Sequence, residues 1–252
     1  MDSVLNRIQK CLESENNALN KLQKSRDTLI VQQNDAQKDV IKAKERLDSI
    51  RENKSAIDPA LIRARNTLAE ALGIDAHDIP FVGELLQIHP TEQAWEKAAN
   101  RVLSGLATQI MIEPDHTKAA RRQIEQHNQG TRVVLFEPKD ITPDITPAPK
   151  EALAHKIQVN YESRFAQVAN YLLHTKATHA CLSAEAFATT TKDAVTQSGA
   201  IKAGRRIIKD DRPSASLQNA YVLGWNTQKA EDEANQILQS AKAELKKVED
   251  EI

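Results

Sequence analysis

The first 57 residues place an apolar side chain at alternating spacings of three and four. When heptad position a is set at Leu5, position d falls on Ile8, and twelve of the sixteen a and d sites up to Ile57 are apolar. An apolar repeat of 3.5 residues gives a narrow stripe, which suits a coiled-coil partner better than a broad globular core. The pattern therefore predicts a helical arm over residues 1–57, although a shorter stripe of this kind also occurs on helices that dock on their own domain.

The last segment, residues 226–252, carries the same repeat. Its six apolar positions alternate steps of four and three: Ala234, Leu238, Ala241, Leu245, Val248 and Ile252. Residues 1–57 have a net charge of +2 and residues 226–252 a net charge of −3. Opposite charges favour pairing between the two arms, and we expect an antiparallel coiled coil.

The two arms differ in length. At 1.5 Å per residue, the first helix could span about 85 Å and the last about 40 Å. About half of the first arm therefore has no partner within the chain. It could pair with a second molecule or fold back, or the chain could be a fragment of a longer protein, which the unbroken register up to Ile252 favours.

The middle of the chain, residues 58–225, has a different composition. It holds all nine aromatic residues, all seven glycines and all nine prolines. Such a segregation predicts one globule between two helical arms. The formal net charge of −1 gives no global attraction to nucleic acid. No apolar run is long enough for a transmembrane helix or a secretory signal, and two cysteines, Cys11 and Cys181, suggest a reducing, cytoplasmic location without a membrane partner.

Short apolar runs alternate with amphipathic segments through this middle part. We expect strands at 84–88, 109–112, 132–136, 156–159, 177–182 and 221–223, and helices at 60–72, 91–107, 115–128, 161–174 and from residue 183. Four prolines predict an extended linker at 138–150. The expected fold is a mixed α/β globule with two similar halves, 58–137 and 151–225, flanked by the antiparallel coiled coil.

Motifs of enzyme chemistry are weak in this sequence. The run Gly199–Arg206 resembles a phosphate-binding loop, but Arg205 stands at the lysine position and Arg206 at the hydroxyl position. His174, His179 and Cys181 lack metal-ligand spacing, and no nucleophile motif surrounds the cysteine. We therefore predict no catalytic residues, no metal, no cofactor and no enzymatic activity for this chain.

One stretch concentrates positive charge. Five of its eleven residues are basic: Lys202, Arg205, Arg206, Lys209 and Arg212. The stretch is either a solvated loop or a sequence-independent, salt-sensitive contact with a DNA backbone. Because no aromatic residue lies within it, base stacking is not expected.

Four motifs resemble the hinge of MukB-like SMC proteins of the Wadjet plasmid-defence system, the JetC family. They are I-P-F-V-G-E-L-L at 79–86, T-Q-S-G-A-I-K at 196–202, K-D-D-R at 209–212 and Y-V-L-G-W at 221–225. The resemblance implies a hinge that joins two SMC subunits as a homodimer, works with other subunits of the defence complex and contacts DNA non-specifically. It also implies an ATPase head elsewhere in the full-length protein, because this chain has neither a Walker A nor a Walker B motif.

Two alternatives stay open at this point. The chain could be a coiled-coil scaffold or another SMC-like hinge that binds a protein partner. It could also be an α/β enzyme or small-ligand sensor with helical extensions, which would need a polar pocket that the sequence does not indicate.

Overall fold

The computed structural model describes residues 2–127, 130–138, 145–210 and 222–251, with the backbone alone at 2–11 and 14. These residues form two compact units, one made of residues 1–48 with 232–252 and the other of residues 49–231. Both long helices run across this division. The domain limits expected after residues 57 and 225 stay predictions.

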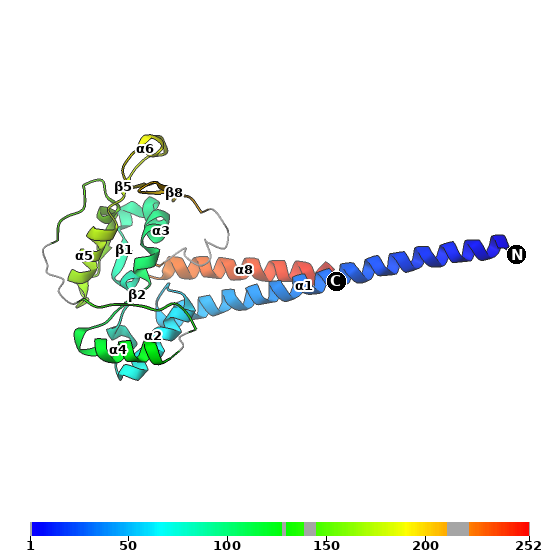
Figure 1. Cartoon of the computed structure of the whole chain (residues 1–252), viewed down its shortest axis with the longest axis horizontal. Helices are drawn as coiled ribbons and strands as arrows, with labels where there is room; N and C mark the ends of the chain where they lie inside the picture. The colour runs from blue at the N-terminus through cyan, green and yellow to red at the C-terminus, as the bar shows by residue number, and fades with distance from the viewer. Residues whose placement is uncertain (1, 128–129, 139–144, 211–221, 252) are drawn as a thin grey trace. The chain divides into compact units, whose positions relative to one another are not determined.

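The helical unit consists of most of α1 (Asp2–Asn53) and α8 (Gln228–Glu251), which run antiparallel and side by side (Figure 1). Residues of the predicted stripes are buried on both helices: Ala43, Leu47, Ala234, Leu238 and Val248. The expected antiparallel pairing of the two arms is confirmed.

The stripe of α1 changes its environment along the helix. Leu47 is 3% exposed, whereas Leu22, in the same heptad register, is 68% exposed. Leu12 and Leu19 are also exposed. The length mismatch that the sequence predicts therefore appears as an apolar seam that is covered toward one end of α1 and open toward the other.

The mixed unit begins with a well-defined turn into α2 (Pro59–Leu72). The carboxylate of Asp58 accepts the backbone N–H of Ala60 at 2.7 Å, and Pro59 occupies the first helical position. Gly73 ends the helix with φ of +69°, a conformation that glycine adopts at low cost. The helix predicted at 60–72 is confirmed.

The two halves of the globule repeat one order of elements. The first half contains η1 (Ala76–Asp78), η2 (Val82–Leu85), β1 (Leu86–Ile88), η3 (Pro90–Trp95), α3 (Glu96–Ala107), β2 (Gln109–Met111), α4 (Pro114–Gln126) and β3 (Val134–Phe136). The second contains η4 (Leu153–Lys156), β4 (Ile157–Val159), α5 (Ala166–Lys176), β5 (Ala180–Cys181), α6 (Ala184–Thr189), β6 (Ala194–Val195), β7 (Ile201–Ala203) and β8 (Arg206–Ile208). Five predicted strands occur, each shorter than expected.

A local two-fold relation connects the halves at β1 and β4. The strands pair antiparallel with Gln87 opposite Gln158 at the centre. The flanking bonds are equivalent: the N–H of His89 donates to the carbonyl of Lys156, and the N–H of Asn160 donates to the carbonyl of Leu85, both at 2.9 Å. The expectation of two similar halves is therefore confirmed.

The relation extends to the outer strands. β2 pairs parallel with β3, and β5 pairs parallel with β6. The N–H of Met111 donates to the carbonyl of Pro80 at 2.9 Å, and the N–H of Cys181 donates to that of Glu151 at 2.8 Å. Each half is thus a 3₁₀ turn, strand, helix, strand, helix and strand, in that order.

Two predictions for the second half were wrong. The segment after α6, in which no strand was expected before residue 221, contains β6, β7 and β8. The expected strand at 221–223 is not one where the structure describes it, at Val222 and Leu223. Their N–H groups both donate to Oδ1 of Asn100, at 2.7 and 3.1 Å, so a side chain takes the place of a neighbouring strand.

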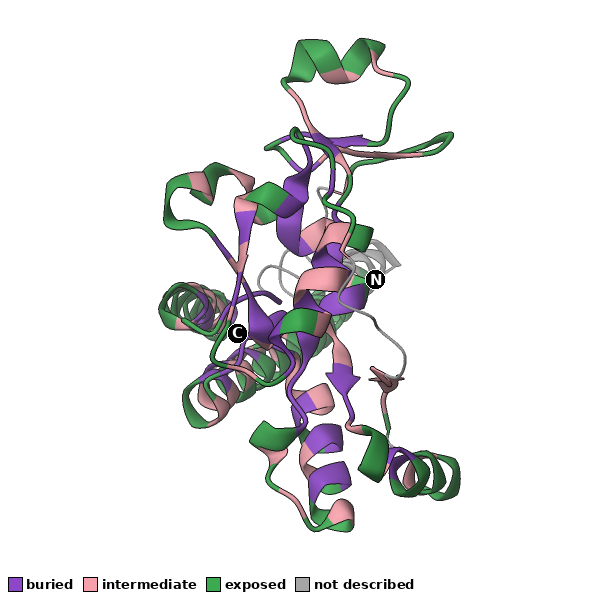
Figure 2. Ribbon diagram, turned by 90° about the vertical axis from the view of Figure 1, so that its left-hand side faces the viewer, coloured by how far each residue is buried: buried purple, intermediate pink, exposed green. Residues whose placement is uncertain are grey.

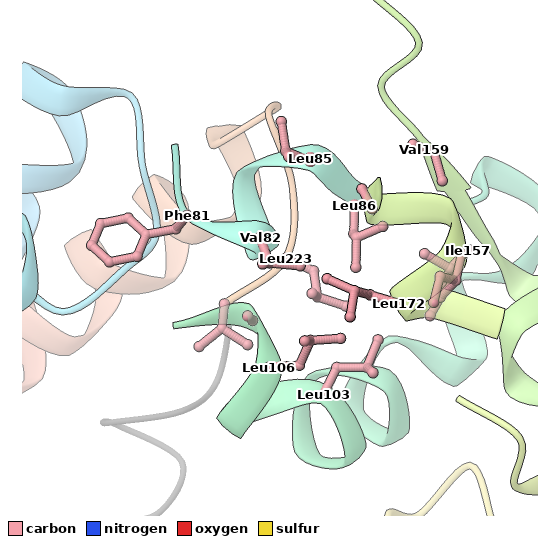
Figure 3. Packing of buried hydrophobic residues seen from close by; sticks show 14 of the residues in the cluster. Phe81, Val82, Leu85, Leu86, Leu103, Leu106, Ile157, Val159, Leu172 and Leu223 are labelled. Carbon is pink, nitrogen blue, oxygen red and sulfur yellow. The ribbon is translucent and has the colours of Figure 1, made fainter. Parts of the chain in front are cut away.

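The core is shared by both halves. Figure 3 shows Leu86 of the first half beside Leu172 and Ile157 of the second, and all three are buried. Figure 2 shows that the α6 lobe at the top is mostly exposed and that buried residues lie along the centre of the globule. Among the described residues, no helix combines the length and apolar character needed to cross a membrane.

Candidate interaction surface

The basic stretch forms a β-hairpin. β7 and β8 pair antiparallel, with Ile201 opposite Ile208 and Ala203 opposite Arg206. Gly204 and Arg205 make the two-residue loop, and Gly204 has φ of +58°, as such tight hairpin turns require. The run that resembles a phosphate-binding loop therefore folds as strand, turn and strand.

The predicted basic residues have different environments. Nζ of Lys202 donates to the carbonyls of Gly204, at 2.7 Å, and Thr191, at 3.4 Å, so this ammonium ties the hairpin to the preceding loop. Arg205 and Arg206 are exposed and make no ion pair with another described residue. Lys209 is exposed, and Arg212 lies outside the described residues.

The outer edge of β8 has exposed apolar side chains. The sheet order is β5-β6-β7-β8, so among the described strands β8 pairs only with β7. Ile207 is 69% exposed and Ile208 is 48% exposed. An edge strand with unpaired backbone groups and apolar side chains is a template for pairing with another strand.

The first half has a comparable edge. β3 pairs only with β2 among the described strands, and its residues Val134–Phe136 are half-buried. Sequence reasoning missed both edges. The signal for the second was present, because β-branched residues flank Gly204 at 201 and at 207–208, a pattern typical of a hairpin.

Two of the motifs meet in the globule. The N–H of Gly224 donates to the carbonyl of Gly83 at 3.0 Å. A Cβ at Gly83 would overlap the carbonyl oxygen of Val222, so only glycine fits there. The motifs at 79–86 and 221–225 are therefore two sides of one packing contact.

Glu84 of the first motif forms an ion pair with a buried arginine. Both of its carboxylate oxygens lie 2.9 Å from Nη1 of Arg65, which is 2% exposed. Glu84 also accepts the N–H of Phe81 at 3.0 Å, and the guanidinium lies 5.1 Å from the centre of the Phe81 ring. The Glu84 carboxylate thus links α2, which carries Arg65, to the 3₁₀ turn that precedes β1.

The mixed unit also contains the ends of both long helices. Nε of Arg51 lies 2.6 Å from Oε1 of Glu231. Nζ of Lys229 lies 3.1 Å from Oε2 of Glu96, at the start of α3. The end of α1 is therefore bonded to the start of α8, and the start of α8 is bonded to α3 of the first half.

The histidine and cysteine candidates, His174, His179 and Cys181, are half-buried. Nδ1 of His174 accepts the N–H of Ala148 at 3.2 Å, and Nε2 of His155 lies 3.0 Å from the carbonyl of Ala148. Burial lowers the pKa of His174, and the nearby His155 lowers it further. Burial raises the pKa of the Cys181 thiol to about 11, which suppresses the thiolate that metals and electrophiles require. No described residues cluster as three or more metal ligands.

No protein-family model and no curated protein sequence matches the chain. Among solved structures, it is similar to the Pyrococcus furiosus Smc hinge domain with an extended coiled coil, at 16% identity and a TM-score of 0.44 over 93% of this chain and 89% of that one. It is also similar to the hinge domain in an asymmetric dimer of Geobacillus stearothermophilus SMC, at 12% identity and a TM-score of 0.45 over 91% of each chain. A third structure, the folded elbow of cohesin, matches at 14% identity and a TM-score of 0.47 over 98% of this chain but only 36% of that chain.

Proposed function

We propose that the chain is the hinge and dimerisation module of an SMC-type protein. The observation that carries this proposal is the open edge of β8, where Ile207 and Ile208 are exposed on a strand that, among the described strands, pairs with β7 alone. A module of this kind must join two polypeptides and must connect each of them to its helical arms. The bond between Arg51 and Glu231 supports the second requirement, because it roots both helices in one globule.

Dimerisation adds a strand of the second copy to β8. Main-chain hydrogen bonds supply affinity in such an addition, and the exposed isoleucines supply the apolar contact. Among the described strands β3 is a free edge of the first half, so in a two-fold symmetric dimer the pairing of β8 with β3 of the partner would occur twice. Two such contacts close the assembly, so no open chain of subunits forms.

The test is the mass of the chain in solution. The monomer mass is 28.0 kDa, and we expect sedimentation to give about twice that value at micromolar concentration. Ile207→Lys should shift the chain to monomer, because a charge replaces the apolar contact at the edge. Tyr161→Lys, at an exposed site in a turn, is the matched control and should leave the dimer intact. A monomeric wild type at about 100 μM would overturn the proposal.

We propose further that the module serves a bacterial anti-plasmid complex of the Wadjet type in the cytoplasm, together with the other subunits of that complex. The support is the resemblance of the motifs at 196–202, 209–212 and 221–225 to the JetC family. The parent reading frame provides the test. A Walker A motif before this segment and a Walker B motif after it are expected, and a frame without them would contradict the assignment.

The hairpin is also proposed as a non-specific DNA contact through Lys202, Arg205, Arg206, Lys209 and Arg212. Arg205 and Arg206 are the main candidates, because both are exposed without a described ionic partner. Lys202 contributes mainly by holding the turn, since its ammonium is bonded to two carbonyl oxygens. Contacts of this type depend on salt and do not read sequence.

A further inference from the structure

Arg101, on α3, binds both ends of the β7–β8 hairpin. Its Nη1 donates to the carbonyl of Gly199 at 2.9 Å, just before β7, and its Nη2 donates to the carbonyl of Asp210, just after β8. One guanidinium thus closes the base of a hairpin that belongs to the other half of the globule. The planar fork of arginine suits this geometry, because it presents two donors in fixed directions.

The turn before β7 is shaped around this guanidinium. Gly199 has φ of +83°, and a Cβ there would lie 2.6 Å from Nη1 of Arg101. Thr196 fixes the turn, since its hydroxyl accepts the N–H of Ala200 at 3.2 Å and its own N–H donates to the carbonyl of Ala200 at 3.0 Å. Thr196 and Gly199 of the motif at 196–202 therefore shape the turn that binds the Arg101 guanidinium.

The helix that carries Arg101 is firmly packed. Ala98, Ala99 and Leu103 of α3 are fully buried. The neighbouring Asn100 binds the N–H groups of Val222 and Leu223, so two adjacent residues of α3 hold two segments of the second half. A guanidinium on such a helix holds the hairpin in one orientation.

We propose that Arg101 is the positioning residue of the β8 edge, holding the hairpin in the orientation in which a second copy adds its strand. The proposal rests on the proposed dimerisation through β8. Preorganisation is the physical reason for the effect, because an edge that is already ordered loses less conformational freedom when the partner binds.

The test compares Arg101→Ala and Arg101→Lys with Arg164→Ala, using the full chain. Arg164 likewise has two partners, the carboxylates of Asp78 and Glu113, and neither of these described partners belongs to the hairpin. We expect Arg101→Ala to raise the dimer Kd about 10- to 100-fold, since it removes two charge-assisted hydrogen bonds. Arg101→Lys should fall between it and wild type, and Arg164→Ala should stay within about twofold of wild type, since its ion pairs are surface exposed.

Hydrogen exchange separates positioning from general loss of structure. In Arg101→Ala, amides at 201–208 should exchange at least about tenfold faster, while those of β1 should keep their wild-type rates. Gly199→Ala should also accelerate exchange at 201–208, because its Cβ would displace the guanidinium and alanine is strained at a φ of +83°.

The outcomes are distinguishable. A wild-type chain that stays monomeric contradicts the proposed function, and the exchange experiment then still reads the role of Arg101 in the hairpin. A dimeric wild type with an unchanged Kd in Arg101→Ala overturns the positioning role alone. Equal acceleration of exchange in β1 and in the hairpin also overturns it.

Discussion

The two halves of the globule share a scaffold and differ at equivalent positions. In the repeat, Glu84 of η2 and His155 of η4 occupy the same place, as the pairing of β1 with β4 fixes the alignment. Glu84 binds the buried guanidinium of Arg65, whereas His155 lies at hydrogen-bonding distance from the carbonyl of Ala148 in the linker. The same fold position thus holds a helix through an ion pair in one half and an extended segment through a contact between an imidazole and a carbonyl in the other.

The difference at the sheet edges has a functional consequence. The first half ends at β3, whereas the second continues from β6 into the hairpin of β7 and β8. The second half also has the shorter helix before its third strand, with six residues in α6 against thirteen in α4. Duplication of a scaffold followed by elaboration of one edge would give a module with two unlike edges, as the proposed pairing of β8 with β3 of the partner requires.

The largest expected effect on stability comes from removing the two side chains at this equivalent position, Glu84 and His155. Glu84→Ala should lower the free energy of unfolding by about 3–5 kcal/mol, because it leaves the charge of Arg65 buried without its partner. His155→Ala should cost only about 1 kcal/mol, the net value of an ordinary hydrogen bond. Urea denaturation of both variants measures the difference. Equal losses of unfolding free energy would contradict the contrast between the Glu84 ion pair and the His155 contact.

An intermediate effect is expected on DNA affinity, since only the second half has the basic hairpin. Arg205→Glu with Arg206→Glu should weaken binding at least about tenfold at low salt and reduce the salt slope by about 2. The control is Arg63→Glu with Arg122→Glu, which makes the same change of charge on exposed sites of the first half. If both double variants weaken binding equally, net charge explains the effect and the hairpin does not.

The smallest effect should appear in the pH dependence of stability. The pKa of His174 lies below its ordinary value of 6.5 because the ring is buried near His155, so the folded chain favours the neutral ring that accepts the N–H of Ala148. The unfolded chain takes up this proton first as the pH falls. The contribution of neutral His174 to stability should therefore be fully present above about pH 6.5 and decline as the pH falls through the lowered pKa.

Chemical denaturation at pH 7.5 and pH 5.5 measures this decline. His174→Gln should remove part of it, and the remainder belongs to groups such as His179, whose pKa is also lowered by burial. A pH dependence identical to that of wild type would show that His174 does not contribute.

The sequence predicts what depends on local pattern. The heptad stripes predict the two arms, and Asp58, Pro59 and Gly73 predict the limits of α2, because the backbone geometry at those positions follows from the residue types. The strands of the second half from β6 onward are two or three residues long and contain polar residues such as Lys202, so their alternation is weak, and only the isoleucines at 201 and 207–208 around Gly204 indicate the hairpin.

The sequence indicates the charge of the candidate site, but not the contacts that hold it. The density of basic residues indicates an interaction surface, but the capture of the Lys202 ammonium by carbonyl oxygens depends on tertiary folding. Arg101 could not be found in this way, since its partner Gly199 lies 98 residues further along the chain. Likewise, the N–H groups of Val222 and Leu223 donate to Asn100 and not to a neighbouring strand. The pattern of apolar and polar residues around 221–223 does not indicate this partner.

Disulfide cross-linking tests the central claim most directly. In a background without Cys11 and Cys181, chains with Ile207→Cys and chains with Leu135→Cys are mixed and oxidised. Pairing of β8 with β3 of a second copy predicts a covalent dimer in the mixture and little in either chain alone. A mixture that yields no more covalent dimer than the single chains would contradict the account.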